Sequence, residues 1–124
     1  MTEYKFDDVV AMTNRERFFE KIISSVTSWD DALDDRDEDD FDAAWSSSFK
    51  RLKDLHYHNE KDERAAKELR ENVFKKVFSL TQSSEVAAHI SDDVGLIADA
   101  ALKSCRVSWV DELFYKYRSG AFPC

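Results

Sequence analysis

The sequence predicts an all-α protein, a compact bundle of five or six helices that forms a single domain over residues 1–124. Apolar residues recur at helical spacing through most of the chain after the first dozen residues. Only two Gly and one Pro occur, too few for the many tight turns that a β-sandwich or barrel requires. A hydrophobic fraction of 43% is also too high for a disordered chain.

The first half of the chain contains two predicted helices. Residues 3–11 fit either a short helix or an extended arm. Thr13 and Glu16 have the spacing of a capping box, which predicts a helix over residues 14–29. A second helix is expected to begin near residues 39–40, because Asp is favoured at helix N-termini. Its apolar stripe consists of Phe41, Trp45, Phe49 and Leu52.

The second half contains the remaining helices. Asn59, followed by Asp62, is a candidate N-cap for a helix over residues 60–80. A short helical stretch with Val86 and Ile90 follows, and Ser91 is expected to cap a separate helix.

The last predicted helix begins at Ser108, which has Asp111 three positions later. Gly120 is a candidate for the residue just past its end, and Pro123 prevents its continuation. We expect most of the apolar stripes to be core.

Charge is concentrated in one segment. Residues 30–42, here called the acidic segment, contain nine acids and one base, Arg36, for a net charge of −8. The other 111 residues contain 17 acids and 17 bases, so the whole imbalance of the chain lies in this segment. We expect residues 30–40 to form a solvated acidic loop, since blocks of like charge repel themselves.

Three interpretations of the acidic segment are open. It is a loop that keeps the protein soluble, a docking site for a positively charged protein surface, or a site for a divalent cation. For docking, an apolar anchor is also needed, and Trp29 and Tyr57 are the candidates. The predicted partner-binding residues are Asp30, Asp31, Asp34, Asp35, Asp37, Glu38, Asp39, Asp40, Asp42, Trp29 and Tyr57.

The sequence argues against metal sites. Asp35, Asp37 and Asp39 resemble the start of an EF-hand loop, but Asp40 stands where Gly is needed and Ser46 where Glu is needed. The spacing of His56 and His58 would place them on different sides of a helix, and a zinc site would need further ligands. We therefore expect no metal and no cofactor.

Catalysis and nucleic-acid binding are also disfavoured. No phosphate-binding loop or nucleophile elbow is present, and two Gly hardly allow one. Neither Cys105 nor His89 belongs to a recognisable nucleophile pattern. No free basic stripe is available for nucleic acid, so we expect neither an enzyme nor a nucleic-acid-binding protein.

Compartment is inferred from two absences. The sequence shows no signal peptide and no apolar stretch long enough to span a membrane. Cys105 and Cys124 are therefore expected to be free thiols in a reducing cytoplasm, and no membrane partner is expected.

The last third of the chain resembles the C-terminal ends of small acidic helical bacterial immunity proteins. The similar stretches are Ser91–Ile97, the helix with Trp109, Leu113 and Tyr117, and residues 120–123. This resemblance implies a non-catalytic cytoplasmic protein that binds a cognate toxin one to one.

The charge pattern and the resemblance together favour an immunity or antitoxin-type inhibitor whose acidic surface engages a basic toxin or another basic protein. The alternative is a structural or regulatory helical protein that self-associates, with a merely solubilising acidic loop; a homodimer is compatible with the sequence.

Overall fold

Seven helices account for most of residues 4–124, the part of the chain that the computed structural model describes. They confirm the all-α class. Their number exceeds the predicted five or six because residues 6–13 and 29–36 are also helical, although two predicted helices are joined into one. Their bounds are α1 Phe6–Thr13, α2 Phe18–Ser24, α3 Trp29–Arg36, α4 Asp39–Lys53, α5 Glu60–Thr81, α6 Ser84–Leu102 and α7 Ser108–Arg118.

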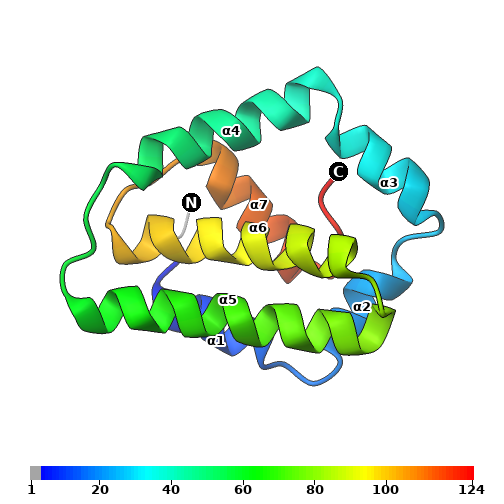
Figure 1. Ribbon diagram of the computed structural model, residues 1–124, viewed down its shortest axis with the longest axis horizontal. Coiled ribbons are helices and arrows are strands. Elements are labelled where there is room, and N and C mark those ends of the chain that lie inside the picture. Colours follow the sequence, from blue (N-terminus) through cyan, green and yellow to red (C-terminus); the bar gives the residue numbers. More distant parts are fainter. Residues whose placement is uncertain (1–3) are drawn as a thin grey trace.

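Helix α6 is the centre of the fold. It packs along its length against α5, with which it forms an antiparallel pair, and it also contacts α1, α4 and α7 (Figure 1). Ile90, Val94 and Ile97 on α6 are fully buried, as are Val73 and Val77 on α5. Helix α4 crosses above α6 in the view of Figure 1, and α3 continues from the N-terminal end of α4.

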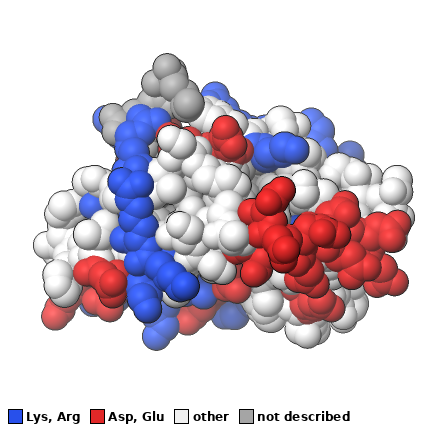
Figure 2. Space-filling view, turned by 90° about the horizontal axis from the view of Figure 1, so that it is seen from above, with Lys and Arg blue, Asp and Glu red and all other residues white. Residues whose placement is uncertain are grey.

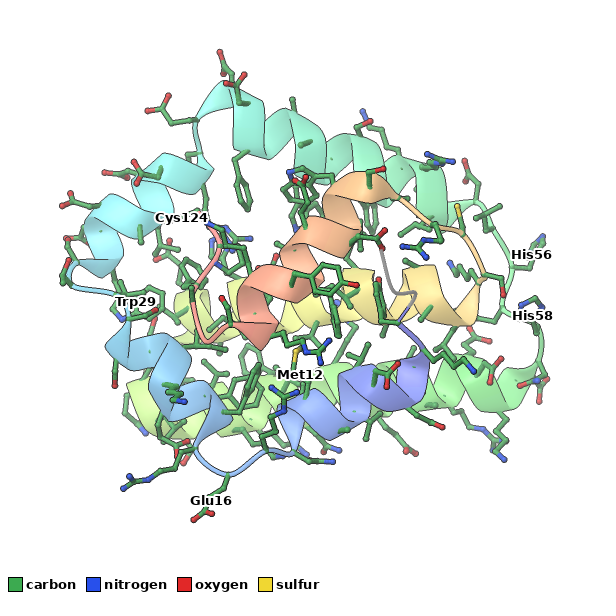
Figure 3. The ribbon with its side chains drawn as sticks, turned by 180° about the vertical axis from the view of Figure 1, so that it is seen from behind. Met12, Glu16, Trp29, His56, His58 and Cys124 are labelled. Atoms are coloured by element: carbon green, nitrogen blue, oxygen red, sulfur yellow. The ribbon has the colours of Figure 1, made fainter. Side chains whose placement is uncertain are left out.

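The predicted helix over residues 14–29 is wrong in its start and its length. Of the two alternatives for residues 3–11, the described part takes the helical one: helix α1 spans Phe6–Thr13. A turn follows, in which Arg17 has a left-handed φ of 61°. The Thr13 hydroxyl donates to the Val10 carbonyl at 3.0 Å, so it bonds backward into α1 and caps nothing after it. The Glu16 side chain points away from the body of the protein (Figure 3).

Two predicted helices near Ser91 are one continuous helix. The Ser91 hydroxyl donates to the Ala88 carbonyl at 3.2 Å, and the cap of α6 is Ser83, whose hydroxyl accepts the Val86 N–H at 3.2 Å. The last helix does begin at Ser108, but without a side-chain cap.

The acidic loop expected over residues 30–40 is also wrong. The Ser28 hydroxyl accepts the Asp31 N–H at 3.3 Å and starts α3, and a short turn joins α3 to α4 at Asp39, where a helix was expected. Acids in the first turns of both helices face the positive ends of the helix dipoles, which offsets part of their mutual repulsion.

Two further predictions are confirmed. Asn59 caps α5 by accepting the Asp62 N–H at 2.8 Å. Gly120 follows α7 with a φ of +90°, a conformation that favours glycine. Within the described residues, none of the helices combines the length and apolarity that crossing a membrane would require.

We predict that Asn59→Ala lowers the free energy of unfolding by about 1 kcal/mol, because the first turn of α5 loses its cap. Urea unfolding measures the loss. Asn59→Asp keeps the side-chain acceptor and serves as the control; an equal loss in both variants would contradict the capping role.

Candidate functional site

The nine acids of the acidic segment form one continuous acidic surface over α3 and the start of α4. All nine side chains are exposed to solvent. They gather at one end of the face shown in Figure 2, while basic side chains gather at its other end, where α4 finishes with Lys50, Arg51 and Lys53. This acidic surface contains every charged residue predicted to bind the partner.

None of these nine carboxylates has an ion pair with a cation of the chain among the pairs found in residues 4–124. Arg36, the one base of the segment, points inward and is 5% exposed. Its charge is therefore hidden from the surface and is matched by Asp93 of α6, which lies outside the segment. The outward field of this surface comes from carboxylates alone.

The buried pair has two-point geometry. Arg36 Nη1 and Nη2 each donate to a different oxygen of Asp93, both at 2.7 Å. Arg36 Nη1 also donates to the Pro123 carbonyl at 3.2 Å. Such paired, charge-assisted hydrogen bonds fix the orientation of both side chains. They connect α3, α6 and the C-terminal residues.

Asp93 is fully buried and receives two more donors. Trp45 Nε1 of α4 donates to Oδ1 at 2.9 Å, and the Tyr117 hydroxyl of α7 donates to Oδ2. Burial, and then the negative charge of Asp93, raise the pKa of Tyr117 well above that of a free tyrosine. Tyr117 therefore stays neutral and keeps donating up to strongly alkaline pH.

The guanidinium of Arg36 lies between two aromatic rings. Its central carbon is 4.5 Å from the centre of the Phe41 ring and 4.9 Å from that of Phe122. Burial alone would lower the pKa of Arg36, but the hydrogen bonds and charge of Asp93 raise it above its usual value. Arg36 Nε is buried without a hydrogen-bond partner in the protein, and the flanking rings supply cation–π contact there.

Neither predicted apolar anchor is a free aromatic on the acidic surface. Trp29 is partly buried, and its ring packs edge-on against Phe122, with ring centres 4.9 Å apart. The hydroxyl of Tyr57 donates to Asp99 at 2.6 Å, and Lys103 Nζ lies 4.5 Å from its ring centre. Tyr57 also lies between His56 and His58, at the end of the molecule opposite Trp29 (Figure 3). Its role as a partner contact stays a prediction.

Metal and thiol chemistry have little support in the geometry. Within residues 4–124, no three His, Cys, Asp or Glu side chains come together as metal ligands would. His56 and His58 project outward from the loop between α4 and α5 (Figure 3), and His58 Nε2 is 3.1 Å from the Ser104 hydroxyl. Cys105 and Cys124 are both free thiols, as predicted.

Sequence reasoning missed the buried cluster around Asp93. One sequence feature points to this cluster, because Arg36 is the single base in a run of acids. The sequence alone gives no sign that its partner lies 57 positions later.

The family model described as Immunity protein PIM1 matches residues 8–124, nearly the whole chain. No curated protein matches the sequence.

We predict that Arg36→Met lowers the free energy of unfolding by about 3–5 kcal/mol, because it leaves the buried Asp93 charge without its counter-ion. Arg70→Met is the matched control: Arg70 pairs with Asp92 at 3.0 Å, but both side chains are about half exposed, so the expected cost is below about 1 kcal/mol. Urea unfolding of both variants makes the comparison. Equal losses would show that the buried pair has no special role.

We also predict that stability falls above about pH 10, where tyrosines of the unfolded chain ionise while the buried Tyr117 stays protonated. Below about pH 10, Tyr117 is protonated in both the folded and the unfolded chain and adds no pH dependence to the free energy of unfolding. Above that pH, its raised pKa in the folded chain lowers the free energy of unfolding by up to about 1.4 kcal/mol per pH unit. Tyr117→Phe should be less stable at neutral pH but lose stability less steeply between about pH 10 and 11. An unchanged alkaline slope in the variant would contradict this assignment.

Proposed function

This chain belongs to the PIM1 family of immunity proteins, and we propose that it neutralises a basic cognate toxin by binding it through the acidic surface. Immunity proteins inhibit a cognate toxin by binding it, and generally without catalysis. In the proposal the chain acts as a non-catalytic inhibitor in the cytoplasm of the bacterium that makes the toxin.

The observation that carries the proposal is that, within residues 4–124, no cation of the chain forms an ion pair with the carboxylates of the acidic surface. Nine exposed carboxylates lie on two adjacent helices, and the segment's own base is buried against Asp93. A concentrated potential of one sign attracts an oppositely charged partner over about 8 Å at physiological salt and about 30 Å at low salt. Such attraction raises association rates by about tenfold to a thousandfold.

The chemistry of the surface indicates the kind of partner. Carboxylates displayed in a row resemble the negative charges of a phosphate backbone, which a nuclease binds in a basic cleft. A nuclease toxin whose cleft is covered by the acidic surface is therefore the form of the proposal that fits best. The same field repels nucleic acid and anionic membranes from this face.

The first experiment measures the rate of association with the cognate toxin. In the test variant, five acids are changed to Asn: Asp34, Asp35, Asp37, Asp39 and Asp40. We expect the association rate at low salt to fall by about tenfold or more and to become less dependent on salt, because the steering field is lost.

A matched control removes the same number of charges elsewhere, by Glu→Gln at exposed positions on other elements: Glu16, Glu20, Glu68, Glu71 and Glu85. This variant should associate within about threefold of the wild-type rate, since its charges lie away from the acidic surface. If both variants slow association equally, net charge and not the acidic surface is responsible. If neither slows it, the proposal is wrong.

Self-association is the competing function, and one observation favours it. Acidic and basic side chains lie at opposite ends of the same face (Figure 2), so two copies arranged head to tail would be complementary. Light scattering at increasing protein concentration separates the two: the inhibitor proposal expects a monomer without toxin and a one-to-one complex with it.

A further inference from the structure

A shallow hollow with an aromatic lining opens within the acidic surface. It measures about 450 Å³ and is lined by Phe41 of α4, Trp109 of α7, three acids and Cys124. The acids are Asp35 at the end of α3, Glu38 between the helices and Asp40 at the start of α4. Cys124 lies beside the junction of α3 and α4 (Figure 3). We call this feature the aromatic hollow.

Its lining combines two properties in one place. Phe41 and Trp109 are partly buried and pack edge to face, with ring centres 5.1 Å apart, so the aromatic floor is fixed by the core. The three acids are exposed and have no ion pair within the chain among the pairs found. Arg36 does not line the hollow, and its charge is matched by Asp93.

We propose that the aromatic hollow receives an arginine side chain of the toxin. A guanidinium is planar, stacks on an indole face and pairs with carboxylates by two parallel hydrogen bonds. The aliphatic part of the same side chain covers apolar surface next to the rings. Lysine fits the charge but lacks the plane that stacks and the fork that pairs.

The chain itself contains this mode of recognition. On the inner side of the fold, Arg36 pairs with a carboxylate at 2.7 Å while its guanidinium lies over Phe41 and Phe122. The aromatic hollow offers the same two kinds of group, acids and aromatic rings, to an arginine arriving from outside.

This inference rests on the proposed function and assigns the association rate and the dissociation rate to different features of the surface. The whole acidic surface sets how fast the toxin arrives. The aromatic hollow sets how slowly it leaves, because anchors that fill a pocket of aromatic residues dominate the lifetime of an interface. Trp29 and Tyr57 do not line the aromatic hollow, and their role as further contacts stays a prediction.

The first experiment needs no toxin. The probe is N-acetyl-arginine methylamide, and its uncharged counterpart N-acetyl-citrulline methylamide has nearly the same shape. In ¹⁵N-labelled protein, the indole N–H resonance of Trp109 should shift saturably with the arginine probe, while those of Trp29 and Trp45 stay in place. A third probe, Nα-acetyl-lysine methylamide, should bind more weakly than the arginine probe.

Two variants with equal charge loss test the geometry. The rim variant carries Asp35→Asn, Glu38→Gln and Asp40→Asn. The control variant removes three acids of the same surface that do not line the hollow, by Asp30→Asn, Asp31→Asn and Asp34→Asn. The arginine probe should bind the rim variant at least tenfold more weakly and the control variant within threefold of wild type. Equal weakening of arginine-probe binding in both variants, or equal shifts of the Trp109 resonance with the citrulline probe, would contradict the proposed arginine site.

The same two variants are then measured with the toxin. Both should slow association to a similar degree, since each loses three charges from the acidic surface. Only the rim variant, and Trp109→Leu, should raise the dissociation rate, by tenfold or more. Phe78→Leu on the exposed side of α5 is the apolar control.

Dissociation rates that are equal in the rim and control variants would contradict the role of the aromatic hollow as an anchor, while leaving electrostatic steering intact. Association rates unchanged in both would instead contradict the proposed function.

Discussion

The ion pair between Arg36 and Asp93 is the constraint on which the acidic surface depends. Helix α3 has eight residues, too few for independent stability in water, and half of its side chains are acids that repel one another. Arg36 attaches it to the centre of α6, and Trp45 and Tyr117 bring α4 and α7 to the same carboxylate. The buried carboxylate of Asp93 thus holds together α3 and α4, the two helices that carry the acidic surface.

The inward direction of Arg36 makes the stability of the fold compatible with the proposed recognition by the acidic surface. A base on the surface of this segment would neutralise neighbouring acids and weaken the outward field. Buried against Asp93, it holds the segment in place and leaves all nine carboxylates facing solvent. The helices also fix the carboxylates before any partner arrives. A disordered loop would lose more conformational entropy on binding, so the helical form favours affinity.

Much of the fold was predictable, and the errors share a cause. Helices α5 and α7 follow from apolar periodicity, the start of α4 follows from the preference of Asp for helix N-termini, and the cap at Asn59 was identified correctly. The wrong boundaries are at Thr13 and Ser91, whose hydroxyls donate backward to carbonyls of their own helix. A hydroxyl is both donor and acceptor, so its spacing to a following acid does not decide whether it begins a helix.

The sequence by itself determined the helical class, the place of the charge imbalance and its sign, because periodicity and charge are local properties of the chain. Only the tertiary structure decided which groups remain available to a partner. All four aromatics are half-buried, but Trp29 packs against Phe122 and Tyr57 donates to Asp99, whereas Phe41 and Trp109 pack together beside three acids of the acidic surface. These partners are 42 to 93 positions apart in the chain. Whether an aromatic is internal or exposed depends on what folding brings beside it, and no local pattern records that.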